Sequence, residues 1–178
     1  MLALVLTLVA CSETPSGPAT TSTIAPASTL QTFEAPELGF EIDHPADWAP
    51  VLKVDEGILE VIAPEAQSGF VPNFNVVTGQ IPVDIPRTAY YEGEIGRLEE
   101  TLPDVQILEV ADVDVDGIPA RGITFTSTEN DTTIGISRLL VLDDEGQAWE
   151  ISFFAEAGTL EDLAPMVTEI FQSFSFVG

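Results

Sequence analysis

Four closely spaced strand patterns in the second half of the chain restrict the fold more than any other feature of the sequence. Alternating apolar positions predict strands near residues 105–115, 118–128, 133–142 and 147–155. The connections between them are short, with Asp116-Gly117 favouring one hairpin turn and the segment 143–146 another. Strands joined in this way pair with their neighbours in antiparallel order, so the sequence predicts a four-stranded meander.

Shorter strand patterns precede the meander, and two helical patterns flank it. Strands are expected in the segment LGFEID and near 49–54, 57–62 and 73–81. The first helical stripe consists of Tyr91, Ile95, Leu98 and Leu102. We expect Asp84 to cap this helix, with Pro86 in its first turn and Pro103 ending it.

A second apolar stripe runs from Leu163 to Phe174 at helical spacing and predicts a C-terminal helix. Because proline is tolerated only in the first turn of a helix, Pro165 favours Asp162 as the N-cap. Amphipathic helices must cover the faces of a sheet. We therefore predict an α+β fold, an antiparallel sheet sandwiched by helices.

The charge of the chain limits its partners. Against 30 Asp and Glu residues stand 5 Lys and Arg residues, a formal net charge of -25. Such a surface repels nucleic-acid phosphates and anionic lipid headgroups. We expect no nucleic-acid partner.

The N-terminus has the pattern of a bacterial lipoprotein signal. Residues 1–10 are mostly apolar and too few to span a bilayer, as in the core of a signal peptide. The run ends in Leu8-Val9-Ala10-Cys11, which resembles a lipobox, and this resemblance implies cleavage before Cys11 and lipidation of its thiol. No Lys or Arg precedes Cys11, so either the true start codon lies upstream or the sequence is truncated.

A Ser/Thr/Pro-rich segment follows Cys11 and divides the anchor from the folded domain. Its composition cannot bury a core, so we expect residues 11–32 to be a tether and residues 33–178 a single domain. The single cysteine of the chain excludes an internal disulfide. We expect a protein held outside the cytoplasmic membrane by its lipid.

Four segments of this domain resemble the PsbP-like domain family. These are GFEIDHPADW, PNFNVV, VDGIPARGITFT and the terminal FQSFSF, and the resemblance covers about 36–177. It implies an antiparallel sheet between helical layers and a binding or accessory role, with no catalytic motif to transfer to this chain.

The segment DVDVDG has the sharpest local pattern of the chain. Asp112, Asp114 and Asp116 before Gly117 match the start of an EF-hand calcium loop. The twelfth position of such a loop is Ile123 instead of Glu, and the flanks read as strands. A plain hairpin with outward-facing aspartates is therefore preferred, and a weak surface calcium site is the alternative.

The remaining candidate residues have structural interpretations. His44, the only histidine, precedes a proline in a turn, and Trp48 and Trp149 occupy expected core positions. Arg121 and Arg138 lie on neighbouring predicted strands and are expected to pair with local acids.

Three function classes follow from these observations. The preferred one is a non-enzymatic binding or accessory module that holds a small or lipidic ligand, or an envelope protein, on its sheet face or in a pocket between sheet and helix. A calcium-responsive surface protein is an alternative, and an envelope hydrolase is a weaker one because a single histidine makes a nucleophile–base pair hard to assemble.

Overall fold

A computed structural model describes residues 29–67, 69–102, 104–129 and 132–177. Cys11, and with it the predicted signal and anchor, lies outside the described residues. The helices and main strands are β1 (Leu30–Ala35), β2 (Phe40–Pro45), β3 (Ala49–Lys53), β4 (Ile58–Ile62), β5 (Asn73–Gln80), α1 (Arg87–Thr101), β6 (Gln106–Val115), β7 (Ile118–Glu129), β8 (Thr132–Leu142), β9 (Gln147–Glu156), α2 (Leu160–Ser173) and β10 (Ser175–Phe176).

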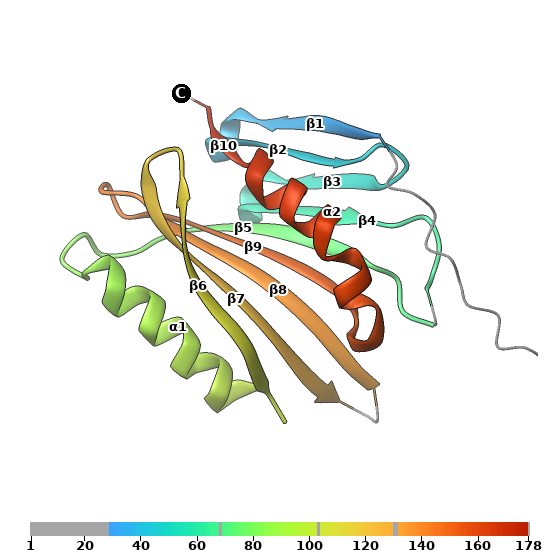
Figure 1. Cartoon of the computed structure of the whole chain (residues 1–178). Helices are drawn as coiled ribbons and strands as arrows, with labels where there is room; N and C mark the ends of the chain where they lie inside the picture. Colours follow the sequence, from blue (N-terminus) through green and yellow to red (C-terminus); the bar gives the residue numbers. More distant parts are fainter. Residues whose placement is uncertain (1–28, 68, 103, 130–131, 178) are drawn as a thin grey trace, which may run out of the picture.

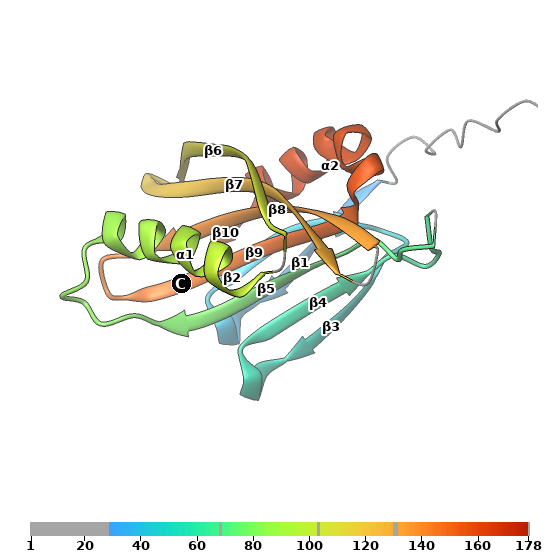
Figure 2. The ribbon, with the colours of Figure 1, turned by 90° about the horizontal axis from the view of Figure 1, so that it is seen from below.

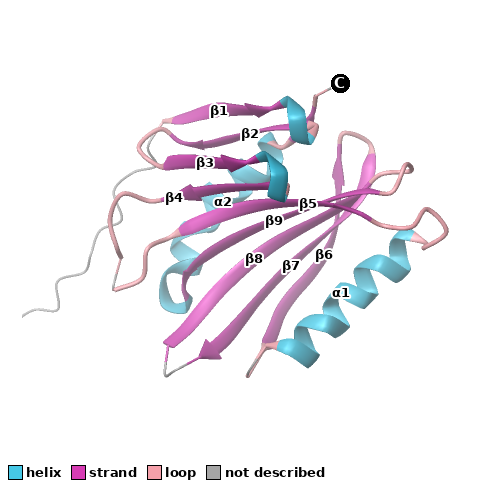
Figure 3. Ribbon diagram, turned by 180° about the vertical axis from the view of Figure 1, so that it is seen from behind, coloured by secondary structure: helices cyan, strands magenta, loops and turns pink. Residues whose placement is uncertain are grey.

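The strands form two antiparallel sheets. The larger has seven strands in the order β3-β4-β5-β9-β8-β7-β6, and the smaller has the order β1-β2-β10. Helix α2 and the small sheet lie on one face of the large sheet, and α1 lies on the opposite face (Figures 1 and 3). The predicted α+β class, with helices on both faces of an antiparallel sheet, is confirmed.

Strands β6 to β9 form the predicted meander, with each strand paired to the next in sequence. The β6–β7 hairpin turns at Asp116 and Gly117, where both residues have positive φ, 51° and 83°. Two positive φ values in a two-residue turn match the twist of the flanking strands. The expected Asp-Gly hairpin is confirmed.

Each face of the large sheet buries its own core. The α2-side core contains the buried stripe of α2 together with Trp48, Trp149 and Phe153. The α1-side core contains Tyr91 and Leu98 of α1. Both predicted helical stripes are therefore core-forming, as their spacing requires.

Both predicted helix caps are wrong. Helix α1 begins at Arg87, and its N-cap position is Pro86 without a side-chain cap, so Asp84 does not cap it. Helix α2 begins at Leu160 after a short 3-10 turn, which places Pro165 inside the helix and leaves Asp162 in its first turn. The buried Leu160 packs against Gly135 of β8, where a Cβ atom would lie only 2.8 Å from its side chain. This tertiary contact sets the start of α2.

The folded domain also begins earlier than expected. Residues Leu30 to Thr32, which composition assigned to the tether, form the first half of β1 and pair with Pro45 to Asp43 of β2. An edge strand of polar residues is stabilised by its partner strand, so its own composition does not reveal it.

Candidate functional site

A groove opens between α2 and the β6–β7 end of the large sheet and has a volume of about 380 Å³. We call it the α2 groove. Its floor includes Ala111, Val113, Gly122, Thr124 and Leu139, and its wall on α2 includes Ala164, Val167, Thr168 and Phe171.

The groove exists because α2 does not cover the whole sheet. The buried stripe of α2 packs over β2, β8 and β9, which leaves β6 uncovered at the sheet edge (Figure 2). Val113 of β6 is consequently 40% exposed although it points to the same face as the buried Val115. Beside it, Ala111 and Gly122 form a cross-strand pair with almost no side-chain volume. Because these two side chains are so small, open space remains above them, and they form the floor of the α2 groove.

A few polar groups accompany this apolar lining. Thr124 and Ser137 line the groove from the sheet, and Gln172 lines it from α2. The Thr168 hydroxyl forms a hydrogen bond within the helix, because it donates to the Ala164 carbonyl at 2.8 Å. An apolar recess of this size with a few hydrogen-bonding groups is the usual form of a small-molecule site.

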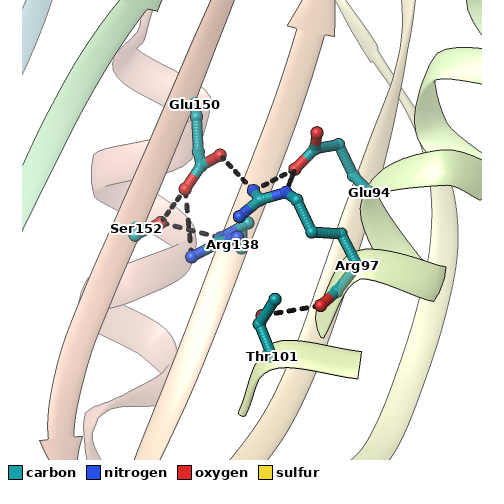
Figure 4. A network of polar contacts seen from close by, with 6 residues as sticks. All are labelled: Glu94, Arg97, Thr101, Arg138, Glu150 and Ser152. Carbon is teal, nitrogen blue, oxygen red and sulfur yellow. Dashed lines mark hydrogen bonds and ion pairs between the residues drawn. The ribbon is translucent and has the colours of Figure 1, made fainter. Parts of the chain in front are cut away.

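The opposite, α1-facing side of the sheet carries a network of charged side chains (Figure 4). Arg138 of β8 donates from Nε to the Ser152 hydroxyl at 2.9 Å and from Nη2 to a Glu150 carboxylate oxygen at 3.0 Å. Arg97 of α1 is bonded to Glu94 and lies 3.8 Å from the other Glu150 oxygen. The network therefore joins α1 to β8 and β9.

Burial dominates the electrostatics of this network. Burial lowers the pKa of Arg138, whose guanidinium also stacks over the Phe125 ring at 5.5 Å from its centroid. Burial, together with Glu94 and Glu150, raises the pKa of Tyr90. The two shifts have opposite effects on proton release, but both come from burial among packed side chains, which favours a structural role for the network.

The three aspartates predicted as calcium ligands each contact a different partner. Asp112 forms a 2.9 Å ion pair with Arg121, and Asp114 accepts a 2.9 Å hydrogen bond from the Gly117 amide. The Asp116 carboxylate faces the Phe176 amide at 3.4 Å. Within the described ranges, no group of three His, Cys, Asp or Glu residues is placed to hold a metal ion. Calcium binding stays an untested prediction.

His44 has the structural role expected of it. Its ring is buried, Nδ1 donates to the Pro45 carbonyl at 2.9 Å, and Nε2 accepts from Gln31 at 3.2 Å. Trp48 and Trp149 are buried in the α2-side core, and the Trp149 indole donates to a backbone carbonyl of the small sheet's turn at 3.1 Å. The predicted pairing of Arg121 and Arg138 with local acids is confirmed by their bonds to the carboxylates described above.

Sequence reasoning anticipated a pocket between sheet and helix but did not identify its residues. The available signal was the pair of small residues, Ala111 and Gly122, on two strands that were predicted correctly as a hairpin. Their juxtaposition requires the register of that hairpin, and the open space above them requires the position of α2.

None of the helices in the described part of the chain is long and apolar enough to cross a membrane.

An antiparallel sheet with one helix on each face places the chain in a class of α+β domains. The sequence profile of the PsbP-like protein family matches residues 12–176, and the chain belongs to that family. The resemblance of the four sequence segments is thus confirmed. Among curated protein sequences, none matches the chain.

Several solved structures share this fold. Cyanobacterial PsbP (CyanoP) from Synechocystis sp. PCC 6803 is 15% identical with a TM-score of 0.64, covering 90% of this chain and 98% of that one. LpqN, described as involved in cell envelope biogenesis of Mycobacterium tuberculosis, is 14% identical with a TM-score of 0.66, covering 84% and 92%. The Ran-binding protein Mog1p of Saccharomyces cerevisiae is 11% identical with a TM-score of 0.62, covering 84% and 96%. At these identities the likeness concerns the fold alone.

Proposed function

We propose that the chain is a lipid-anchored, non-enzymatic binding module outside the cytoplasmic membrane, and that its α2 groove holds a small amphipathic ligand. The observation that carries this proposal is the groove itself, an apolar recess of about 380 Å³ with hydroxyl groups in its lining. A groove of this size suits one aliphatic chain or one small ring system with a polar end.

The proposed location is supported by the sequence pattern before Cys11 and by the involvement of LpqN, a protein of the same fold, in cell envelope biogenesis. Lipidation of Cys11 would attach acyl chains to the new N-terminus, and two or more chains make such an anchor stable. The acidic domain would stand clear of anionic headgroups on its tether.

The contacts of His44, the only histidine of the sequence, support binding over hydrolysis. Its ring is buried and is bonded to Gln31 and to the Pro45 carbonyl. A hydrolase that activates its nucleophile with histidine needs that imidazole within hydrogen-bond reach of the nucleophile.

Filling the groove tests the proposal. The Cβ of a side chain at Gly122 would lie 3.8 Å from the Ala111 carbonyl oxygen, an ordinary contact, so Gly122→Leu should fold. We expect the purified full chain to bind the neutral fluorophore N-phenyl-1-naphthylamine and Gly122→Leu to bind it roughly tenfold more weakly, because leucine occupies the groove floor. Fluorescence titration measures both affinities.

Gly79→Leu is the matched control. It adds the same side chain to a strand of the same sheet, at a position with nothing within 4 Å and outside the groove. We expect it to bind the fluorophore as the natural chain does. Equal loss of binding in both variants, or no binding by the natural chain, would contradict the proposed site.

A further inference from the structure

The charged side chain that faces the α2 groove from the sheet is a carboxylate. Glu109 follows the alternation of β6 that points Val113 and Val115 to the α2 side, and it is exposed beside Thr124. Asp114 lies near the other end of the groove, but it alternates with Val113 and Val115, so its carboxylate lies on the opposite face of the strand and accepts a hydrogen bond from the Gly117 amide.

Arg138 also borders the groove, but its side chain does not face it. Its guanidinium contacts Ser152, Glu150 and the ring of Phe125, all on the α1 side of the sheet. Successive side chains of a strand point to opposite faces, so Arg138 contributes its backbone to the groove while its charge lies behind the sheet.

All five Lys and Arg residues of the sequence are segregated in this way. Arg87 and Arg97 belong to α1, on the far face of the sheet (Figure 3). Arg121 and Arg138 project toward the α1-side core, where they approach aromatic rings. Lys53 of β3 lies on the face opposite to the α2-side core and pairs with an acid there. The side of the molecule that contains the α2 groove therefore has no Lys or Arg side chain.

Helix α2 adds further negative charge to the same side. Its charged residues are Glu161, Asp162 and Glu169. Glu161 precedes Ala164 and Thr168 at spacings of three and seven, which places it on the groove-facing side of the helix. Glu109 and Glu161 thus place acidic side chains on the α2 side of the sheet, which has no neutralising Lys or Arg. In a chain of net charge -25 the negative potential of this groove attracts cations and repels anions.

We propose that the α2 groove selects amphiphiles whose polar end is a cation, an amine or quaternary ammonium group on an aliphatic body. This inference rests on the proposed function of the groove and names the chemical class of its ligand. The aliphatic part lies over Ala111, Gly122 and Phe171, and the cation lies at the end marked by Glu109. An anionic amphiphile of equal length gains the same apolar contact but is repelled by the carboxylates.

Three probes that share one alkyl chain separate charge from apolar contact. These are octyltrimethylammonium, octyl glucoside and octyl sulfate, each below its micelle concentration and each titrated against bound N-phenyl-1-naphthylamine on the full chain. We expect the ammonium to displace the fluorophore at about tenfold lower concentration than the glucoside, and the sulfate to be weakest. Added sodium chloride should reduce the differences because salt screens exposed charges.

Two variants assign the selectivity to the groove. Glu109→Gln should lower the affinity for the ammonium until it is close to the affinity for the glucoside, which should itself stay unchanged. Glu34→Gln removes the same charge from exposed β1 and should leave the preference intact. Gly122→Leu should weaken binding of the ammonium and of the glucoside to the same degree. This result distinguishes binding in the groove from attraction to the acidic surface.

The outcomes separate this inference from the proposed function. If the glucoside and the fluorophore bind in a Gly122-dependent manner but the ammonium shows no advantage, the cationic class is wrong and the groove remains a ligand site. The same holds if Glu109→Gln and Glu34→Gln have equal effects. If no probe depends on Gly122, the proposed function itself is overturned.

Discussion

At the scale of single residues, Arg138 shows how this acidic chain uses one of its few cations in its interior. The side chain is 10% exposed and is held by Ser152, Glu150 and the face of Phe125. Its carboxylate partner is 22% exposed, so both charges of the pair are largely withdrawn from water. Removing one member leaves the other without compensation in a poorly hydrated site.

We therefore expect Glu150→Leu to lower the free energy of unfolding by roughly 3 kcal/mol. The double variant Glu150→Leu, Arg138→Met should recover most of this loss, because no unpaired charge remains buried. Urea unfolding measures the three values, with exposed Glu92→Gln on α1 as a control expected to be near neutral. Additive losses in the double variant would show that the pair is not coupled.

Residue identity alone predicted part of this arrangement. Arg121 and Arg138 were expected to have acidic partners because cations are rare and neighbouring strands were evident. Glu150 as the particular partner of Arg138 follows from the β8–β9 register, in which Arg138 lies opposite Ser152, two residues from Glu150. The contribution of α1 through Arg97 depends on long-range packing.

At the scale of elements, the β6–β7 hairpin and α1 use glycine for different reasons. Gly117 adopts a φ of 83°, a left-handed conformation that side chains with a Cβ atom adopt reluctantly. Gly93 lies inside α1, with open space where a Cβ atom would stand. The same substitution at these two positions should therefore have opposite effects.

Gly117→Ala should destabilise the domain by about 1 kcal/mol because alanine is strained at this φ. Gly93→Ala should stabilise it by a similar amount because alanine loses less backbone entropy in a helix. Thermal or urea unfolding of both variants measures the difference in sign. A neutral Gly117→Ala would mean that the turn relaxes to another type.

The helix starts show why element boundaries were less predictable than element types. Helical spacing identified both apolar stripes, since spacing is a property of adjacent residues. Asp84 and Asp162 were plausible caps by residue type, but neither occupies the N-cap position. Leu160 begins α2 because it packs against β8, a contact with a segment far away in the sequence.

At the scale of the whole molecule, the two sides of the large sheet have different characters. The α1 side contains every Lys and Arg side chain, and the α2 side contains the groove. The small sheet lies on the same side as α2 (Figure 1). The β1 strand that follows the proposed tether belongs to this small sheet. The proposed anchor would therefore enter the domain on the side without Lys or Arg, which favours a tethered domain held off anionic headgroups.

The anchor is tested on the whole chain in a bacterial host. We expect the natural chain to incorporate alkyne-tagged palmitate and to fractionate with membranes, and Cys11→Ser to lose both properties because the acylated thiol is absent. Ser12→Ala, the neighbouring substitution, should retain both. Membrane association of an unlabelled Cys11→Ser chain would contradict the lipid anchor.

Local sequence determined the element types, the β6–β9 meander, the Asp-Gly hairpin and the excess of negative charge. The charge is a sum over the composition, and the other features depend on residues close together in the chain, whose periodicity and turn chemistry act over short distances. Tertiary structure alone decided the pairing of β5 with β9, the second sheet, the helix starts and the placement of α2 away from β6. The α2 groove and the segregation of cations from it belong to this second group. They arise from contacts between distant segments, whose energies depend on packing in three dimensions and leave no periodic pattern in the sequence.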